Sequence, residues 1–282
     1  MRKITSTSTY IILFSFFLII GLMSSCRPDP KDDIVVGQSK EEFDEADQVM
    51  IGNAISEIIN ESTNGLDVLT EEDHQEVYNH LNTIIDQIAN TVYVQKREEF
   101  DWKISILKND EEVNAFILPG GHLYIYSGLL KFLEGEHELV GMMAHEMSYI
   151  DSDNLMNQLK NEFGSKNLSK VISNDPESHA ILSDIVDAMG HMDFDETAVR
   201  EADQFCTDII CEFEWDGEGL LSLVRRGGGD PFKTIEWLQS RPVTDERIDN
   251  LTDIIYNRIE TCGTPDSIYY QRYLSKVIEK LP

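Results

Sequence analysis

Residues 138–149 read Glu-Leu-Val-Gly-Met-Met-Ala-His-Glu-Met-Ser-Tyr, and we expect a helix over 136–151. On a helix, positions i and i+4 lie one turn apart on the same face. Histidines at positions 145 and 149 could therefore bind one Zn²⁺ ion while a glutamate at position 146 activated a water molecule. The residue at 149 is a tyrosine, whose phenol has a pKa near ~10 and must lose a proton before it becomes a competent ligand. The stretch therefore has the form of a hydrolytic zinc site with one ligand missing.

Around this helix, the sequence predicts a few strands followed by many helices. Apolar residues recur at helical spacing over 41–60 and 71–92. Residues 102–107 alternate apolar and polar side chains and residues 122–126 follow a Pro-Gly-Gly turn, so two or three strands are expected here. The helices expected after the strands are 136–151, 153–164, 196–213, 216–225, 231–239, 244–260 and 267–280. This order of elements is typical of an α+β domain.

The N-terminus predicts an exported protein with a lipid anchor. Arg2 and Lys3 precede an apolar run over 10–23, which is too short for a comfortable membrane-spanning helix. Ser24-Ser25-Cys26 follows, as in a lipobox, so we expect residues 1–25 to be a lipoprotein signal peptide and Cys26 to be lipidated. The alternative is an uncleaved N-terminal anchor.

The mature chain is strongly acidic. Loss of the signal peptide removes two of the 23 basic residues and none of the 52 acidic ones, so the formal net charge becomes −31 instead of −29. Phosphate backbones and anionic headgroups repel such a surface, so we expect no nucleic-acid partner and assign membrane attachment to the lipid. We expect a flexible tether over 26–39 and one domain over 40–282. The expected location is the bacterial cell envelope outside the cytoplasm, and the sequence leaves open whether the membrane is the outer one and whether the chain lies on the cell surface.

Three cysteines remain when Cys26 carries the lipid: Cys206, Cys211 and Cys262. Three thiols form at most one internal disulfide. Either Cys206 or Cys211 could pair with Cys262 in an oxidising compartment, and the sequence does not choose between them.

Further motifs surround the His-Glu pair. Residues 114–121 read Asn-Ala-Phe-Ile-Leu-Pro-Gly-Gly, and residues 124–130 read Tyr-Ile-Tyr-Ser-Gly-Leu-Leu. With Glu201-Ala202-Asp203 and the Ser-Arg-Pro-Val-Thr-Asp-Glu-Arg-Ile of residues 240–248, they closely resemble metallopeptidase family forty-eight, the gluzincin family of the HtpX and CAAX prenyl proteases. The resemblance covers residues 41–260. It implies a zincin-like α+β domain, mostly helical, with a small sheet bordering the cleft.

The resemblance also implies a degenerate zinc site. His145 matches the first ligand and Glu146 the catalytic glutamate, whereas Tyr149 replaces the second ligand. The third ligand of the family, a glutamate four residues before Asp203, falls on Val199, which has no lone pair to offer. A catalytic zinc needs three protein ligands and an open position for water. We therefore expect no cofactor, and zinc only if the site is active.

Other positions of the family pattern are partly kept. Arg241 stands where the family has a histidine that stabilises the tetrahedral intermediate, whereas the supporting residues Asp203 and Arg247 are retained. Replacement ligands are the alternative to a dismantled site. The candidates are His137, His191, Asp195, Glu196, Glu201 and a Tyr149 phenolate.

The favoured function is that of a membrane-anchored pseudopeptidase that binds polypeptide or a partner protein. Such proteases bind substrate as an extended strand at a sheet edge, and backbone pairing of this kind does not depend on the metal. The expected edge is His122, Leu123, Tyr124, Ile125 and Tyr126. One alternative is an active zinc metalloendopeptidase with substitute ligands, and another is a purely structural envelope lipoprotein.

Overall fold

The computed structural model describes residues 42–61, 65–213, 215–229, 235–241, 243–258, 262–263 and 267–282. These residues belong to one compact unit. The expected signal peptide, Cys26 and the tether lie outside the described residues. Within the described part of the chain, no helix has both the length and the apolar character needed to cross a membrane.

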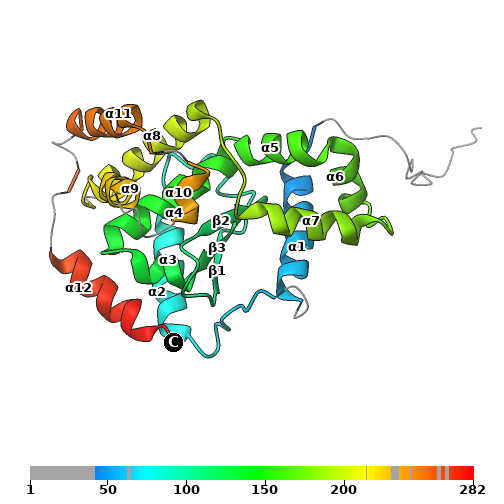
Figure 1. Ribbon diagram of the computed structural model, residues 1–282, viewed down its shortest axis with the longest axis horizontal. Coiled ribbons are helices and arrows are strands. Elements are labelled where there is room, and N and C mark those ends of the chain that lie inside the picture. The colour runs from blue at the N-terminus through cyan, green and yellow to red at the C-terminus, as the bar shows by residue number, and fades with distance from the viewer. Residues whose placement is uncertain are drawn as a thin grey trace, which may run out of the picture. The chain divides into compact units, whose positions relative to one another are not determined.

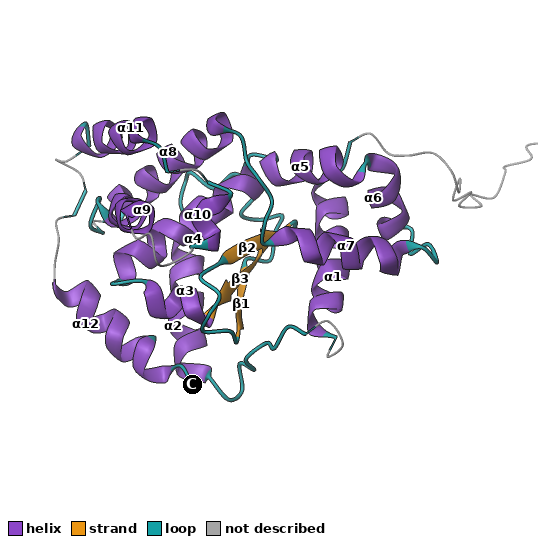
Figure 2. Ribbon diagram, viewed as in Figure 1, coloured by secondary structure: helices purple, strands orange, loops and turns teal. Residues whose placement is uncertain are grey.

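The described chain is mostly helical with one small sheet, as Figure 2 shows, so the predicted α+β class is confirmed. The helices before and beside the sheet are α1 (Glu45–Asn60), α2 (Gln75–Ala89), α3 (Ser127–Phe132) and α4 (Glu136–Asp151). Those that follow are α5 (Asn154–Phe163), α6 (Ser165–Ile172), α7 (Ser178–Met189), α8 (Glu196–Glu212), α9 (Gly219–Gly229), α10 (Glu236–Gln239), α11 (Asp245–Tyr256), α12 (Ser267–Lys276) and the 3₁₀ helix η1 (Ile278–Lys280).

Helices α6 and α7 lie in a stretch where we expected none. Helix α6 is only eight residues long, so its apolar residues Leu168, Val171 and Ile172, although at helical spacing, fill less than the window over which periodicity predicts a helix. It packs against α1 and α7, and these tertiary contacts stabilise a helix that is too short to be stable alone.

The sheet consists of β1 (Lys103–Leu107), β2 (Ala115–Leu118) and β3 (His122–Tyr126) in the order β1-β3-β2. Strand β2 turns into β3 as an antiparallel pair, and β1 lies parallel to β3 on its other side. Strand β3 is thus the central strand, and both of its sides are already paired. The prediction that His122 to Tyr126 form a peptide-binding edge is therefore wrong, because an added strand needs an unpaired edge. The error arose because β1 is brought beside β3 by a parallel pairing that local alternation does not reveal.

Helix α4 lies against the sheet and carries the His-Glu pair. It contacts β2 and β3, while α1 and α7 contact β2 and α2 contacts β1 (Figure 1). Every residue of α4 except His137 is buried. A helix buried on all sides leaves its charged residues no access to water, so each of them needs a partner inside the protein.

One disulfide joins the end of α8 to the segment before α12. It links Cys211 to Cys262, whereas Cys206 is free and buried. The Cys206 thiol donates to the carbonyl oxygen of Gly141 on α4 at 3.3 Å, and burial raises its pKa well above the ordinary value. A thiol of this kind packs α8 onto α4 and is not a nucleophile.

Candidate functional site

His145 lies in the C-terminal half of α4 and faces Asp203 on α8. The Nε2 atom of His145 is 3.1 Å from Oδ1 of Asp203 and 3.4 Å from Nη2 of Arg247. Burial lowers the pKa of His145 to about 4, although the carboxylate of Asp203 pulls it upward. His145 is therefore neutral at pH 7, with the Nε2 proton donated to Asp203 and with Nδ1 buried and unpartnered.

Glu146, the next residue of α4, is held by two side chains from a later segment. Its Oε1 atom accepts a hydrogen bond from the indole nitrogen of Trp237 at 2.7 Å and lies 2.6 Å from Nη2 of Arg241. Burial raises the pKa of the Glu146 carboxyl above its ordinary range in spite of the opposing charge of Arg241. A carboxylate engaged in this way is not placed to act as a general base on a water molecule.

Arg247 fixes the position of Arg241. Thr244 caps the start of α11 by accepting a hydrogen bond from the backbone amide of Arg247 at 3.0 Å. The guanidinium of Arg247 then makes two hydrogen bonds of 2.9 Å to Asp203 and one of 2.7 Å to the carbonyl oxygen of Arg241. Burial favours the neutral acid form of Asp203, but the hydrogen bonds from His145 and Arg247 outweigh it and hold the pKa of Asp203 below its usual range. The two supporting residues of the family pattern thus anchor the backbone beside Arg241.

Tyr149 and Val199, at the two degenerate ligand positions, are both buried. The Tyr149 ring stacks on Phe194 with a centroid separation of 3.7 Å and an interplanar angle of 8°. Burial keeps the Tyr149 phenol protonated, with its pKa far above neutral, and its hydroxyl has no partner. A protonated phenol and an aliphatic side chain are not metal ligands.

The proposed replacement ligands do not gather at the site. Asp195 caps α8 by accepting from the amides of Thr197 and Ala198 at 2.9 Å, and the side chains of His191, Glu196 and Glu201 are exposed. No group of three or more His, Cys, Asp or Glu side chains among the described residues could hold a metal ion. Since Nε2 of His145 and the carboxylate of Glu146 are also taken by protein partners, the residues present do not fit a catalytic zinc ion.

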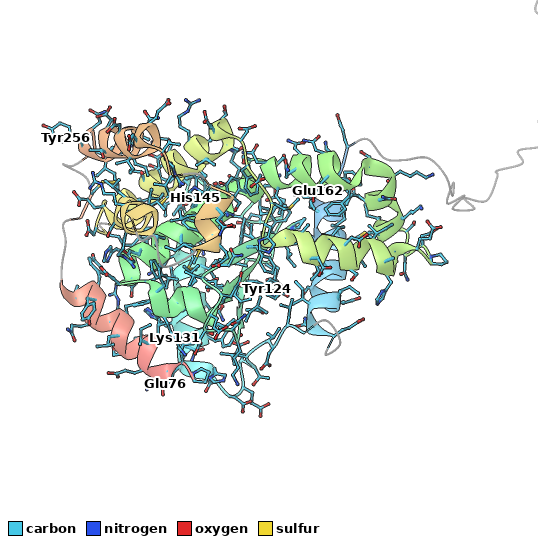
Figure 3. The ribbon with its side chains drawn as sticks, viewed as in Figure 1. Glu76, Tyr124, Lys131, His145, Glu162 and Tyr256 are labelled. Atoms are coloured by element: carbon cyan, nitrogen blue, oxygen red, sulfur yellow. A yellow bond between two sulfur atoms is a disulfide. The ribbon has the colours of Figure 1, made fainter. Side chains whose placement is uncertain are left out.

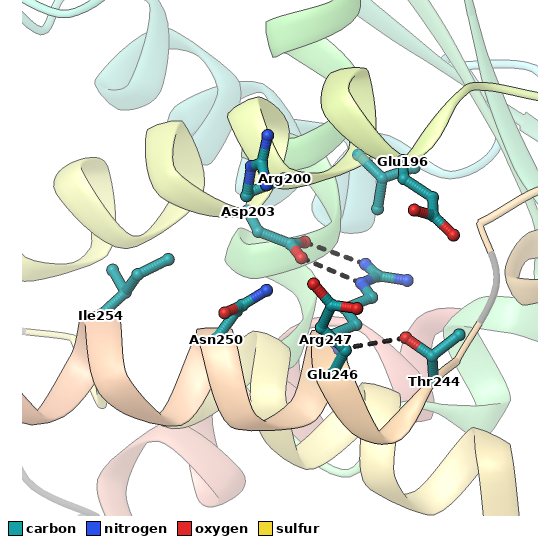
Figure 4. Close-up of a pocket in the computed structure, with 9 residues that line it drawn as sticks. Glu196, Arg200, Asp203, Thr244, Glu246, Arg247, Asn250 and Ile254 are labelled. Atoms are coloured by element: carbon teal, nitrogen blue, oxygen red, sulfur yellow. Dashed lines mark hydrogen bonds and ion pairs between the residues drawn. The ribbon is translucent and has the colours of Figure 1, made fainter.

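The site is closed to solvent. Figure 3 shows His145 within the packed interior, in contrast to Tyr256 and Glu162, which project outward. The residues exposed by 0 to 6% include Tyr149, His145, Trp237, Glu146, Asp203, Val199, Arg241 and Arg247. A small cavity of ≈ 60 Å³ lies behind them between α8 and α11, where Val199, Asp203 and Arg247 meet surface residues such as Glu196 and Asn250 (Figure 4).

Sequence reasoning brought together His145, Glu146, Asp203, Arg241 and Arg247, and the structure places these five side chains in one cluster. It missed Trp237 and Phe194, the two aromatic residues that complete the cluster. Trp237 is four residues before Arg241, a spacing that brings two residues close on a helical turn, and this was the available signal. Phe194 had no such signal, because its contact with Tyr149 is purely tertiary.

The fold and the His-Glu pair on its central helix define a domain of the metallopeptidase class. The profile of peptidase family M48 matches residues 76–255, which is more than half of the chain. The chain therefore belongs to peptidase family M48, as the sequence motifs predicted.

Characterised relatives match over short stretches. The mitochondrial metalloendopeptidase OMA1 of Schizosaccharomyces pombe is 31% identical over 62 residues, which are 22% of this chain and 18% of that protein. The beta-barrel assembly-enhancing protease of Escherichia coli K12 is 32% identical over 56 residues, 20% of this chain and 12% of that protein. OMA1 of Bos taurus is 26% identical over 84 residues, 29% of this chain and 16% of that protein. The matched stretches span less than a fifth of each relative.

Proposed function

We propose that this chain is a zinc-independent, catalytically inactive member of family M48 that acts by binding polypeptide. One observation carries the proposal of inactivity: Arg241 and Trp237 occupy the carboxylate of Glu146 in a closed interior. The residue that would deprotonate a zinc-bound water in the family is here part of a buried ion pair. Tyr149 and Val199 offer no ligand in place of the missing two.

The groove between α8 and α11 supports the binding role. Two neighbouring hollows share Arg200, Asn250 and Ile254, and the outer one has a volume of ≈ 430 Å³. Their linings present carboxylate, guanidinium and amide groups together with the apolar side chains of Val199 and Ile254, which suits an extended polypeptide with its mixed side chains and backbone amides. The names of the relatives describe proteases, one of them beta-barrel assembly-enhancing, and proteases must hold polypeptide chains. We infer a client polypeptide of the cell envelope.

Metal analysis of the purified full-length chain tests the loss of catalysis. We expect far less than one zinc per chain and little change in Tm with added Zn²⁺, whereas binding at a hundred times Kd would stabilise the native state by roughly 2.7 kcal/mol. Stoichiometric zinc that a chelator removes and added metal restores would contradict the proposal.

A crosslinking experiment tests polypeptide binding. A photoreactive amino acid at Glu201, which is exposed and lines the groove, should crosslink to reduced, carboxymethylated casein. The matched control carries the same group at Glu162, which is exposed on α5. Equal labelling at both positions, or none at either, would leave a purely structural envelope protein as the better description.

The anchor is a separate part of the proposal. We propose that Cys26 carries a lipid that holds the chain on a membrane outside the cytoplasm, because Ser24 and Ser25 precede it after a short apolar run. Cys26→Ser should then move the protein from the membrane fraction to the soluble fraction and abolish labelling by a fatty-acid analogue. Unchanged labelling would rule out lipidation at this residue.

A further inference from the structure

Two of the departures from the zinc site meet, because the Tyr149 ring lies beside the guanidinium of Arg241. Its central carbon lies 5.4 Å from the ring centroid of Tyr149, 5.4 Å from that of Phe194 and 5.2 Å from that of Trp237. The distance to Trp237 falls within the range of a cation–π contact. The rings of Tyr149 and Phe194 stack on one another, so a guanidinium equally distant from both packs against the edges of the two rings. Glu146 contacts the same group at 2.6 Å and supplies the negative charge.

We propose that Tyr149, Phe194, Trp237 and Glu146 form a binding site for a guanidinium ion, which Arg241 fills from within the chain in place of a metal ion. We call these four side chains the guanidinium cage. Tyr149 is then a wall of the cage and not a failed ligand. This role explains why an aromatic residue at position 149 is accompanied by an arginine at position 241.

Hydrogen bonds orient the cation in the cage. Nη1 of Arg241 donates to the carbonyl oxygen of Trp237 at 3.0 Å and to Oγ of Ser240 at 2.7 Å, while Nη2 faces Glu146. The fork of donors on a planar guanidinium matches this set, and the compact ammonium of a lysine does not. The cage therefore selects for the shape of the cation as well as for its charge.

The formal charges of the buried side chains cancel when the cage holds a cation of single charge. The side chains of Glu146 and Arg241 form one buried ion pair, and those of Asp203 and Arg247 form another, so their formal charges cancel. A divalent metal ion added to this set would be an uncompensated buried charge, which is strongly unfavourable. Zinc and Arg241 thus exclude one another.

Chemical rescue of the full-length chain tests the cage. Arg241→Ala should lower Tm by about 6 °C or more, because it leaves the carboxylate of Glu146 buried without its cation. N-ethylguanidinium chloride at low millimolar concentration should restore several degrees, whereas ethylammonium chloride at the same concentration should not. The wild-type chain, whose cage is filled, should respond to neither salt. No recovery, or equal recovery with both cations, would overturn the proposal.

A second variant keeps the test decisive if Arg241→Ala does not fold. Glu146→Gln with Arg241→Met removes both charges, so its Tm should lie above that of either single variant. Additive losses would show that the two side chains do not act as a pair. This inference does not rest on the proposed function, because zinc content tests the loss of catalysis and the response of Tm to guanidinium tests the cage.

Discussion

At each end of α4 the same residue types hold a buried glutamate, but the pKa of the carboxyl is shifted in opposite directions at the two ends. Near its start, buried Glu136 accepts a hydrogen bond from the indole of Trp215 at 3.3 Å and pairs with Arg272. Near its end, buried Glu146 accepts from the indole of Trp237 and pairs with Arg241. An indole and a guanidinium from later in the chain thus hold a glutamate at each end.

The two ends differ in the solvent exposure of the paired arginine and in the number of basic side chains that bind the carboxylate. Burial raises the pKa of both carboxyls, but at Glu136 hydrogen bonds from His80 and Arg272 outweigh burial and the pKa is lowered. At Glu146 burial outweighs the pull of Arg241 and the pKa is raised. The side chain of Arg272 is 39% exposed and that of Arg241 only 4%. The arrangement around Glu146, a glutamate held by an indole and a guanidinium, thus also occurs in this protein far from any catalytic motif. In the closed arrangement, the charge of Glu146 depends more strongly on its one cationic partner, Arg241.

The largest contrast is expected from arginine substitutions at the two ends. Arg247→Met leaves Asp203 buried without its cation and releases the carbonyl oxygen of Arg241, so it should cost about 3–5 kcal/mol of unfolding free energy. Arg272→Met leaves Glu136 with His80, Trp215 and partial access to water, so the loss should be about 1–2 kcal/mol. Urea unfolding measures both, and equal losses would remove the distinction between the ends.

Of the two ends of α4, the closed one should respond more strongly to acid. The pKa of folded His145 is lowered to about 4, whereas an unfolded histidine titrates near ~6.5, so the unfolded state binds the proton first. Stability should therefore be lost as pH falls from about 6.5 to about 4, by an amount on the order of 3 kcal/mol. His145→Gln should flatten this part of the curve of unfolding free energy against pH, which urea unfolding at a series of pH values measures. Half-buried His122, with a pKa of about 3, adds a loss of the same sign that this variant retains.

Reconstruction of the zinc site tests whether the cage replaced it. Tyr149→His, Val199→Glu and Arg241→His together should give one zinc per chain, with a stabilisation of roughly 2.7 kcal/mol at a hundred times Kd. The control keeps Arg241 and changes only Tyr149 and Val199, and its zinc content should stay low because the guanidinium remains beside Glu146. A folded triple variant without zinc would show that Tyr149 and Val199 do not correspond to the missing ligands.

The smallest effect is expected from the hydroxyl of Tyr149, which has no partner. Tyr149→Phe keeps the aromatic wall of the cage and removes a buried unsatisfied group, so the unfolding free energy should stay the same or rise, by less than about 1 kcal/mol. Tyr78→Phe is the matched control, because its hydroxyl donates to the carbonyl oxygen of Leu69 and accepts from the amide of Ile106. In thermal unfolding, Tyr78→Phe should therefore lower Tm more than Tyr149→Phe does.

Much of the fold follows from local sequence. The helix over 136–151 matches α4, and the alternation at 102–107 and the turn before 122 mark β1 and β3. The order of the strands did not follow, because parallel pairing of β1 with β3 depends on contacts between distant residues. The sequence predicted which residues belong to the site but not which of them contact one another. The Arg241–Glu146 pair joins positions 95 apart in the chain, and no spacing rule connects them.

The disulfide between Cys211 and Cys262 closes a covalent ring with a sequence separation of 51. The segments that deliver Arg241 and Arg247 to α4 both lie within this ring. A crosslink of this length reduces the entropy of the unfolded chain by an amount worth about 4 kcal/mol at room temperature. Reduction should therefore lower the unfolding free energy by up to this amount. The freedom that the unfolded chain gains lies mostly in the segments that enclose Glu146, because the sheet is outside the ring.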